Sequence, residues 1–318
     1  MQFSFSLAKL QKNLRICKKK CNFAAIFEKY TLYMIKVALF GYGNIGHYAE
    51  QAIRLAPDME LVGIFHHDEV EQAIAAKPEV VLLSIPSREV PKIAPLFLQA
   101  GISTVDSFDI HLDIPTVREQ LNGTASRAVS ILSAGWDPGT DSVVRCMLEA
   151  MAPGGTTYTN FGPGRSMGHT VVAKSKAGVK DALSMTLPVG NGVHKREVYV
   201  VLEEGALLKD VEQAIKQDPY FVNDDTKVIA VPSLDGISTV QHGVLIERNG
   251  VSGVTDNQRM SFEMTINNPA LTGQVMTSCA RAAYRLAQNK QFGCYTLIEL
   301  PLVTLLPGTA EENVKRLV

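Results

Sequence analysis

The chain has 318 residues, of which 46% are hydrophobic and 20% are charged, and its formal net charge at pH 7 is −1. These values are typical of a globular protein long enough for two domains. Without a basic excess the chain lacks the charge that nucleic-acid-binding surfaces need, and no apolar run reaches the ~18 residues of a membrane-spanning helix.

The cysteines limit the class of protein further. Five are present, an odd number scattered along the chain, which favours a reducing cytoplasm over a framework of disulfides. Cys17 and Cys21 have no second pair with the spacing of a zinc site, so we expect no bound metal.

Residues 1–33 form a separate basic and mildly amphipathic segment. They lack the long apolar core and small residues of a secretory signal. We interpret them as an N-terminal extension that is disordered or that reflects an upstream start, with Met34 as the initiator; an organellar targeting peptide is the alternative.

A strand followed by a glycine-rich loop and a helix begins the folded part of the chain. The apolar run Ile35–Phe40 predicts a buried strand, and it leads into Gly41-Tyr42-Gly43-Asn44-Ile45-Gly46, a G-x-G-x-x-G sequence. Apolar residues at helical spacing follow through Ile53. Between a strand and a helix, such glycines allow a sharp turn, a close approach to a pyrophosphate and tight helix packing. We therefore predict a dinucleotide-binding loop.

Alternating strands and helices continue to residue 139. The predicted strands are Glu60–Phe65, Val80–Ile85, Ser103–Asp106 and Ala128–Ser133, with helices at Val90–Ala100 and after Asp113. This alternation predicts an α/β fold with a doubly wound parallel sheet, in which ligands bind beyond the carboxyl ends of the strands. Residues Ser84-Ile85-Pro86-Ser87 come at one such end and are predicted to contact the coenzyme.

The second strand ends in His66-His67, where an NAD-type site usually has an acid that holds the ribose hydroxyl. Two imidazoles could hydrogen-bond to the phosphate of NADP, but histidines of an exposed loop explain the pair equally well. The residues alone leave the choice between NADP and NAD open.

From about residue 140 the pattern changes to an α+β domain, a sheet with helices on one face. A predicted helix at Asp141–Met151 and another at Leu207–Gln217 accompany the strands Thr156–Phe161, Glu197–Leu202, Lys227–Val231, Val244–Arg248 and Met260–Ile266. Asn268 and Pro269 cap a long helix through Gln288, and an apolar strand and tail, Tyr295–Leu306, close the chain. We predict a dinucleotide-binding domain at 34–139, completed by about 275–318, and a second domain at 140–274.

Polar residues beside strand ends are the candidates for chemistry. Asp109 and Asp137 follow two strands of the parallel sheet, where their carboxylates could hold a substrate ammonium or exchange protons with it. Turn or N-cap aspartates would look the same. Arg196 could hold a carboxylate with two hydrogen bonds, although a solvated basic face is the commoner reason for the cluster His194-Lys195-Arg196.

Several segments together resemble the meso-diaminopimelate dehydrogenase family. In chain order they are FGYGNIG at 40–46, VDSFDIHLDIP at 105–115, SAGWDPG at 133–139, NFGPGRSMGH at 160–169, VHKR at 193–196 and RAAYRLAQ at 281–288. The resemblance runs from Met34 to Val318. It implies an NADP-dependent bacterial amino-acid dehydrogenase, a homodimer of subunits that each have a dinucleotide domain and a domain for substrate binding and dimerisation.

The resemblance also implies roles for individual residues. The loop Gly41–Gly46 binds the pyrophosphate, and Ser107-Phe108-Asp109 and Gly135-Trp136-Asp137-Pro138 line both the coenzyme and the reacting amino-acid centre. Asp109 and Asp137 bind the reacting ammonium and assist proton transfer. Phe161 lies where the family commonly has a tryptophan, and four residues hold the distal, L-configured end of the substrate: Thr186, Arg196, His242 and Asn268.

One departure from the family bears on the coenzyme. The family has Ser-Arg-Arg for the 2′-phosphate where this chain has His66-His67-Asp68. We therefore expect NADP with relaxed preference, so that NAD is also possible. The function implied is reversible oxidative deamination of meso-2,6-diaminopimelate at its D-centre, in the synthesis of lysine and of cell-wall precursors. The alternatives are an NAD(P)-dependent dehydrogenase of another D-amino or 2-oxo acid, and a non-catalytic redox sensor.

Overall fold

A computed structural model describes residues 34–235, 237 and 242–318. The expectations for residues 1–33, including Cys17 and Cys21, lie outside the described residues. Everything reported below belongs to the unit formed by Ile35–Val318.

Six parallel strands form the largest sheet, in the order β13-β5-β4-β3-β1-β2. Their order places β1, which precedes the glycine loop, between β3 and the edge strand β2. From β1 the chain therefore continues to β2 on one side and then to β3, β4, β5 and β13 on the other. The prediction of a doubly wound parallel sheet is confirmed. The strands are β1 (Ile35–Phe40), β2 (Met59–Phe65), β3 (Val80–Leu83), β4 (Ser103–Asp106), β5 (Val129–Ile131) and β13 (Gly293–Tyr295).

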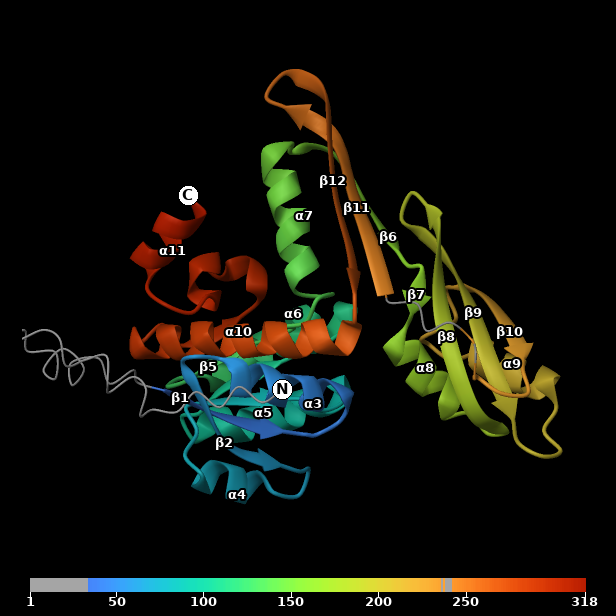
Figure 1. Cartoon of the computed structure of the whole chain (residues 1–318), viewed down its shortest axis with the longest axis horizontal. Helices are drawn as coiled ribbons and strands as arrows, with labels where there is room; N and C mark the ends of the chain where they lie inside the picture. Colours follow the sequence, from blue (N-terminus) through green and yellow to red (C-terminus); the bar gives the residue numbers. More distant parts are fainter. Residues whose placement is uncertain (1–33, 236, 238–241) are drawn as a thin grey trace, which may run out of the picture. The chain divides into compact units, whose positions relative to one another are not determined.

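Helices cover both faces of this sheet because alternate residues of β1 face opposite cores. Val37 and Leu39 pack with α3 (Asn44–Leu55) and α10 (Asn268–Gln288). Ala38 and Phe40 belong to the opposite core. On that face lie α4 (Val70–Ala75), α5 (Val90–Gln99) and α6 (Ile114–Thr124), and Figure 1 shows the two layers.

The polypeptide after β5 builds two further sheets where the sequence predicted one. The first has the order β12-β11-β6 and packs against α7 (Thr140–Met151) through Leu148, Val244 and Ile246. Its strands are β6 (Gly154–Phe161), β11 (His242–Ser252) and β12 (Thr255–Ile266), and β11 and β12 form a long antiparallel hairpin.

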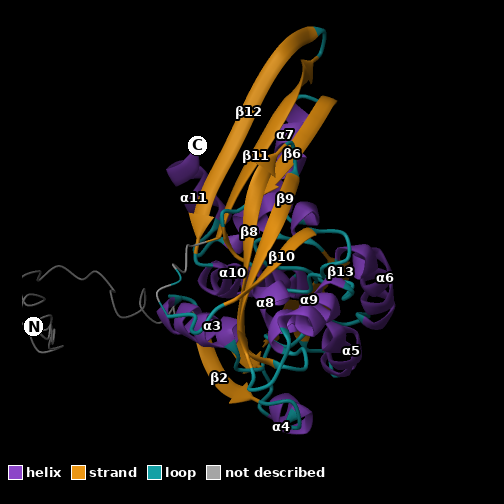
Figure 2. Cartoon of the chain, turned by 90° about the vertical axis from the view of Figure 1, so that its right-hand side faces the viewer, coloured by secondary structure: helices purple, strands orange, loops and turns teal. Residues whose placement is uncertain are grey.

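The second sheet has the order β10-β9-β8-β7, with helices on one face, as Figure 2 shows. Its elements are β7 (Gly164–Arg165), α8 (Met167–Lys174), β8 (Val179–Gly190), β9 (Val193–Leu202), α9 (Leu208–Lys216) and β10 (Asp225–Ala230). The sequence analysis missed β8. Its residues 182–186 are all buried, so the strand lacks the alternation of exposed and buried positions that identifies a half-buried strand.

The end of the chain differs from its prediction. The strand is Gly293–Tyr295; the segment predicted as an apolar strand and tail, Tyr295–Leu306, instead continues as two 3₁₀ turns, η3 (Leu297–Glu299) and η4 (Leu302–Leu305), followed by α11 (Ala310–Leu317). Pro301 explains part of this, because a proline cannot donate to a strand ladder. In the described part of the chain no helix combines the length and apolarity required to cross a membrane.

Candidate functional site

The loop between β1 and α3 has the backbone of a pyrophosphate-binding turn. Gly41 has φ +91°, and a Cβ there would lie 2.4 Å from the carbonyl oxygen of Ser84, so the glycine is required by the protein's own packing. Gly43 differs, because a Cβ there would meet no atom within 4 Å. Gly43 is also the N-cap of α3, and neither a side-chain cap nor an acid neutralises that end of the helix. The loop therefore leaves space for a phosphate beside the N-terminal end of α3, where the positive end of the helix dipole is not neutralised by a side chain.

A buried polar atom without a partner lies beside this loop. The hydroxyl of Ser84, directly after β3, has no hydrogen-bond partner among the described residues, and its Cβ is 3.6 Å from the position of a Cβ on Gly46. Buried hydroxyls are normally hydrogen-bonded. The residues present therefore fit a bound dinucleotide, which would supply the missing partner.

The other residues predicted for the coenzyme lie along the carboxyl edge of the same sheet. His66 and His67 follow β2 and are exposed, as is Asp68. The backbone N–H of His66 donates to Glu69 Oε2 (2.7 Å), which fixes the start of this loop. Ile85, Pro86 and Ser87 follow the carboxyl end of β3.

Eleven of the predicted residues meet in one cavity of about 390 Å³. This volume suits a small ligand. The wall contains residues from the parallel sheet, from both smaller sheets and from the first turns of α3 and α10. The predicted residues in it are Ile45, Ser107, Asp109, Gly135, Trp136, Asp137, Phe161, Thr186, Arg196, His242 and Asn268.

Asp109 lies in the wall on the loop after β4. Its carboxylate accepts a hydrogen bond from the Ser87 hydroxyl (2.6 Å), and its own N–H donates to the same hydroxyl (3.2 Å). Ser87 thereby fixes the loop that presents Asp109. The side chain itself remains exposed, so it can receive a ligand.

Asp137 is held by an arginine from the next helix. Arg145 Nη2 donates to Asp137 (3.1 Å), while Nη1 donates to Asp141 (2.9 Å). Burial and the neighbouring Asp137 carboxylate raise the pKa of Asp141, and the Arg145 guanidinium opposes this rise. Arg145 thus pairs with both carboxylates and holds them side by side. The turn before α7 depends on Gly139, because a Cβ there would lie 1.8 Å from the Gly135 carbonyl oxygen.

Asp106 joins the two loops that carry Asp109 and Asp137. Its Oδ1 accepts from the N–H groups of Phe108 (2.9 Å) and Ser133 (3.1 Å). Burial raises the pKa of Asp106 to about 7, because these two hydrogen bonds only partly compensate for desolvation. The sequence analysis assigned Asp106 to a strand and gave it no role, since nothing in the sequence distinguishes a carboxylate that is turned inward.

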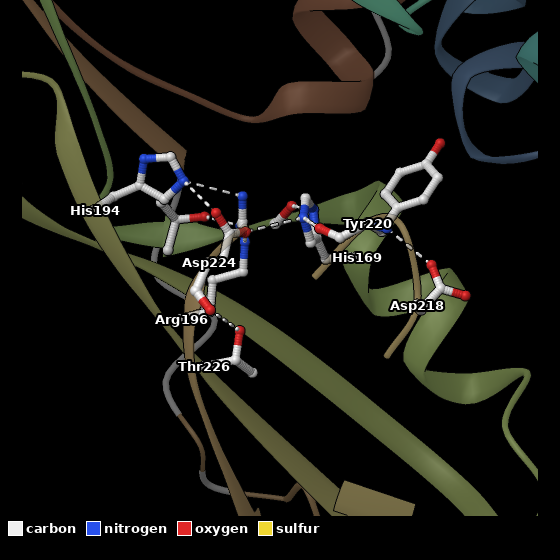
Figure 3. Close-up of polar contacts among 9 residues, drawn as sticks. His169, His194, Arg196, Asp218, Tyr220, Asp224 and Thr226 are labelled. Carbon is white, nitrogen blue, oxygen red and sulfur yellow. Dashed lines mark hydrogen bonds and ion pairs between the residues drawn. The ribbon is translucent and has the colours of Figure 1, made fainter. Parts of the chain in front are cut away.

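Arg196 lies on β9 at the centre of a buried polar cluster, shown in Figure 3. It is 8% exposed, so the alternative of a solvated basic face is wrong for this residue. Its Nη1 donates to Thr186 (2.8 Å), and its Nε donates to Asp224. Burial alone would raise the pKa of Asp224, but the adjacent imidazoles of His169 and His194 and the Arg196 guanidinium outweigh it and hold that pKa far below its usual range.

Aromatic rings and one amide complete the wall. Trp136 packs edge-to-face against His242 (ring centroids 4.9 Å apart) and against Phe161 (6.0 Å). Burial lowers the pKa of His242 to about 4. Asn268 was predicted to cap α10, but Asn267 is the cap and accepts from the Ala270 N–H (3.2 Å). Asn268 is thus available to face the cavity.

Eight residues of the wall are not among the site residues assigned from the sequence. They are His111, Ser166, Met167, Gly168, His169, His194, Tyr220 and Thr272. Those between 166 and 169 belong to the segment NFGPGRSMGH and could have been chosen from it. Tyr220 and the supporting Asp224 carry no sequence signal, because only the fold brings their loop to Arg196. Among the described residues no group of three or more His, Cys, Asp or Glu side chains is placed to hold a metal ion.

Comparisons with known proteins agree on one family. Residues 135–268 match the family model of the diaminopimelic acid dehydrogenase C-terminal domain. The chain is 49% identical to the meso-diaminopimelate D-dehydrogenase of Bacteroides fragilis, over 89% of this chain and 99% of that protein. It is 31% identical to the enzyme of the same name from Corynebacterium glutamicum, over 89% and 98%.

Two solved structures have the same fold. The C. glutamicum diaminopimelate dehydrogenase in complex with diaminopimelate superposes with a TM-score of 0.82 at 30% identity, covering 89% of this chain and 99% of that one. An engineered D-amino acid dehydrogenase bound to NADP⁺ superposes with a TM-score of 0.81 at 29% identity, covering 90% and 100%.

Proposed function

Since the chain belongs to the meso-diaminopimelate D-dehydrogenase family, we propose that it oxidises meso-2,6-diaminopimelate at its D-centre with NADP. The products are L-2-amino-6-oxopimelate, the ring-opened form of tetrahydrodipicolinate, together with ammonia, NADPH and a proton. The reaction is reversible, and in the direction of amination it would serve lysine and peptidoglycan precursor synthesis.

One observation supports this function most directly: the wall of a single cavity contains both carboxylates and a guanidinium. Asp109 and Asp137 follow strands of the parallel sheet, whereas Thr186 and Arg196 come from the four-stranded sheet. A substrate with an amino-acid group at each end can bind an ammonium to the carboxylates and a carboxylate to the guanidinium.

The chain's own residues bind, orient and exchange protons. NADP, when bound along the glycine loop and the strand ends, supplies the acceptor for the hydride that leaves the substrate α-carbon. Asp109 and Asp137 hold the reacting ammonium, and its deprotonation allows the C–N bond to become an imine, which water hydrolyses. No side chain is assigned as a separate general base. Most of the rate enhancement is orientation of the D-centre by groups fixed at both ends.

Binding of the non-reacting, L-configured end determines which end of the substrate lies at the coenzyme and reacts. We assign Thr186, Arg196, His242 and Asn268 to the L-configured end, supported by their places in the same wall. A substrate without a distal carboxylate loses the contact with Arg196 and is expected to bind weakly.

For the coenzyme we assign the loop Gly41–Gly46 to the pyrophosphate and the segments 84–87, 107–109 and 135–138 to the nicotinamide half. The basis is their position at one edge of the parallel sheet. His66 and His67 are assigned to the 2′-phosphate. With Asp68 beside them, a weaker preference for NADP over NAD follows.

The domains and the assembly follow the same assignment. We divide the described chain into a dinucleotide-binding domain, 34–139 with about 275–318, and a substrate-binding and dimerisation domain, 140–274; α10 crosses the boundary as a continuous helix. The open edge of β12 in the three-stranded sheet is the surface that we assign to a homodimer. Light scattering on the purified protein tests the dimer.

A cytoplasmic location is part of the proposal. It rests on cysteine usage: Cys146, Cys279 and Cys294 are unpaired thiols in the described residues. Fractionation of cells tests it, and recovery of the activity outside the cytoplasmic fraction would contradict it.

Initial rates of NADP and NAD reduction test the activity. We expect turnover with meso-diaminopimelate at alkaline pH and none with the LL-isomer, which lacks a D-centre. Turnover of another D-amino acid instead would establish a different dehydrogenase, and coenzyme binding without turnover of any amino acid would favour the redox sensor.

A further inference from the structure

Three basic side chains of the cavity wall converge on one carboxylate. Asp224 lies within 3.5 Å of the Nε2 atoms of both His169 and His194, and it accepts from Arg196 Nε. Asp224 itself does not belong to the residues that line the cavity. Figure 3 shows His194 and His169 on either side of the Arg196–Asp224 pair.

His194 has two mutually exclusive partners. Arg196 Nη2 donates to His194 Nε2 (3.2 Å), which requires a neutral ring with a lone pair on that nitrogen. The same nitrogen is 3.5 Å from Asp224 Oδ1, to which it can donate only when it carries a proton. His194 Nδ1 is buried and has no partner among the described residues, so the ring is not otherwise fixed.

The local charge does not suit a carboxylate ligand as it stands. Asp224 already neutralises Arg196, and both side chains are largely removed from solvent, with 17% and 9% of their surfaces exposed. A ligand carboxylate placed on Arg196 lies close to the Asp224 carboxylate, and the two anions share one guanidinium, although the ammonium on the same carbon balances the net charge of the ligand. The repulsion between two nearby carboxylates in a largely buried site favours the uptake of a proton by a neighbouring base.

The other imidazoles are poor acceptors for this proton. His169 Nε2 donates to the carbonyl of Tyr220 (2.6 Å), and its Nδ1 pairs with the Ser166 hydroxyl (2.9 Å), so both nitrogens are satisfied in the neutral ring. Burial also lowers the pKa of His169 and of His242. Around His194 the charged groups are Asp224 from the segment before β10 and Arg196 on its own strand, while β6 contributes the apolar ring of Phe161.

We propose that His194 takes up a proton from solvent when the distal carboxylate of the substrate binds to Arg196. The Nε2–H of His194 then donates to Asp224 Oδ1, and Arg196 Nη2 is released from His194 to donate to the ligand. This inference rests on the proposed function, because it assigns the distal carboxylate to Arg196. It makes His194 a positioning residue that couples substrate binding to protonation.

Calorimetry measures this proton directly. Meso-diaminopimelate is titrated into the enzyme saturated with NADPH, a pair of reduced reactants that cannot turn over, at about pH 8, where a free imidazole is neutral. The titration is repeated in buffers of different ionisation enthalpy, because the slope of the observed heat against that enthalpy gives the number of protons taken up. We expect the wild type to take up about one proton more than His194→Gln, whose amide cannot be protonated.

Asp224→Asn provides a second variant. Without the Asp224 charge, Arg196 alone balances the ligand carboxylate, and the proton uptake is expected to disappear although the substrate still binds. Equal proton numbers in the wild type and in both variants would overturn this inference and leave the proposed function intact. Absence of any meso-diaminopimelate binding by an enzyme that binds NADPH would overturn the proposed function and the inference with it.

Discussion

Two neighbouring residues of β9 illustrate how a strand separates structural from functional charge. Arg196 is buried and contacts Thr186 and Asp224, whereas Lys195 points to the other face, 56% of its side chain exposed, and pairs with Asp225 (3.3 Å). Because successive residues of a strand point to opposite faces, substitutions of Arg196 and Lys195 form a matched pair that tests where the distal carboxylate of the substrate binds.

We expect Arg196→Met to raise the KM for meso-diaminopimelate by about 10²-fold or more, because a charge-assisted contact to the substrate carboxylate is lost. Lys195→Met should leave the KM within about twofold, since surface pairs contribute little. Steady-state kinetics on both variants check this. A similar KM for Arg196→Met and the wild type would place the distal carboxylate elsewhere.

Asp106 makes the stability of the protein depend on pH. Its pKa rises on folding from 3.8 to about 7, so the folded state retains the proton that the unfolded chain loses. The stabilisation is therefore complete below about pH 4 and is lost as the pH rises through 7.

Asp106→Asn keeps an oxygen for the Phe108 and Ser133 N–H groups and cannot ionise. Urea unfolding at pH 5 and pH 8 should show that the wild type loses roughly 2–3 kcal/mol more than the variant over this range. A parallel pH dependence of the two proteins would show that Asp106 does not titrate in this window.

At the scale of elements, one ion pair ties α10 to the parallel sheet. Arg281 is 3% exposed and contacts both carboxylate oxygens of Asp58, the residue before β2, at 2.7–3.0 Å. Because α10 also carries Asn268 and Thr272 at its first turns, this contact helps to position part of the cavity wall.

Arg281→Met leaves Asp58 without its cation and should lower the free energy of unfolding by about 2–4 kcal/mol. Lys92→Met is the control, since its pair with Glu89 is 70% exposed on the lysine side and is worth less than about 1 kcal/mol. Chemical denaturation measures both. Equal effects would mean that the Arg281 pair is no stronger than a surface contact.

How well the sequence predicts an element depends on the pattern of buried and exposed residues along that element. The strands β1 and β3 are short apolar runs, and β4 is a short segment between two predicted helices; all three were predicted with nearly their observed bounds. The strand β8 was missed because its buried stretch does not alternate. The apolar strand and tail predicted for Tyr295–Leu306 is shorter as a strand than expected, since β13 ends at Tyr295 and Pro301 cannot donate to a strand ladder. The division of the second half into two sheets is set by long-range pairing, as between β11 and β6, which no local pattern encodes.

The site shows the same limit. Arg196, Asp109 and Asp137 could be chosen as candidates because they adjoin predicted strands. Asp224 and Tyr220 could not, because the turn that carries them reaches Arg196 only through the parallel pairing of β10 with β9. The interior orientation of Asp106 was also beyond the sequence, which records a residue type and not the direction of a side chain.

At the scale of the whole molecule, the preference for NADP over NAD depends on the loop after β2, and measuring it tests whether this loop binds the 2′-phosphate. Asp68 is exposed beside His66 and His67, where we place the 2′-phosphate. We expect Asp68→Arg to tighten NADPH binding by about tenfold and to leave NADH binding unchanged, because only NADPH has the additional phosphate. Fluorescence titrations measure both dissociation constants.

Glu311→Arg makes the same charge change on the exposed surface of α11 and serves as the control. Tighter binding of NADH by Asp68→Arg, or equal gains in the control, would indicate a general electrostatic effect and not a 2′-phosphate contact.

Isotope transfer tests the proposed reaction most directly. Meso-diaminopimelate is prepared with deuterium at either the D or the L α-carbon, and the NADPH formed from each is analysed by mass spectrometry. Removal of hydride at the D-centre predicts deuterium in the coenzyme from the D-labelled substrate alone. Deuterium transferred from the L-labelled substrate would contradict the assignment of the two ends of the cavity, and NADPH free of deuterium in both reactions would contradict the proposed chemistry itself.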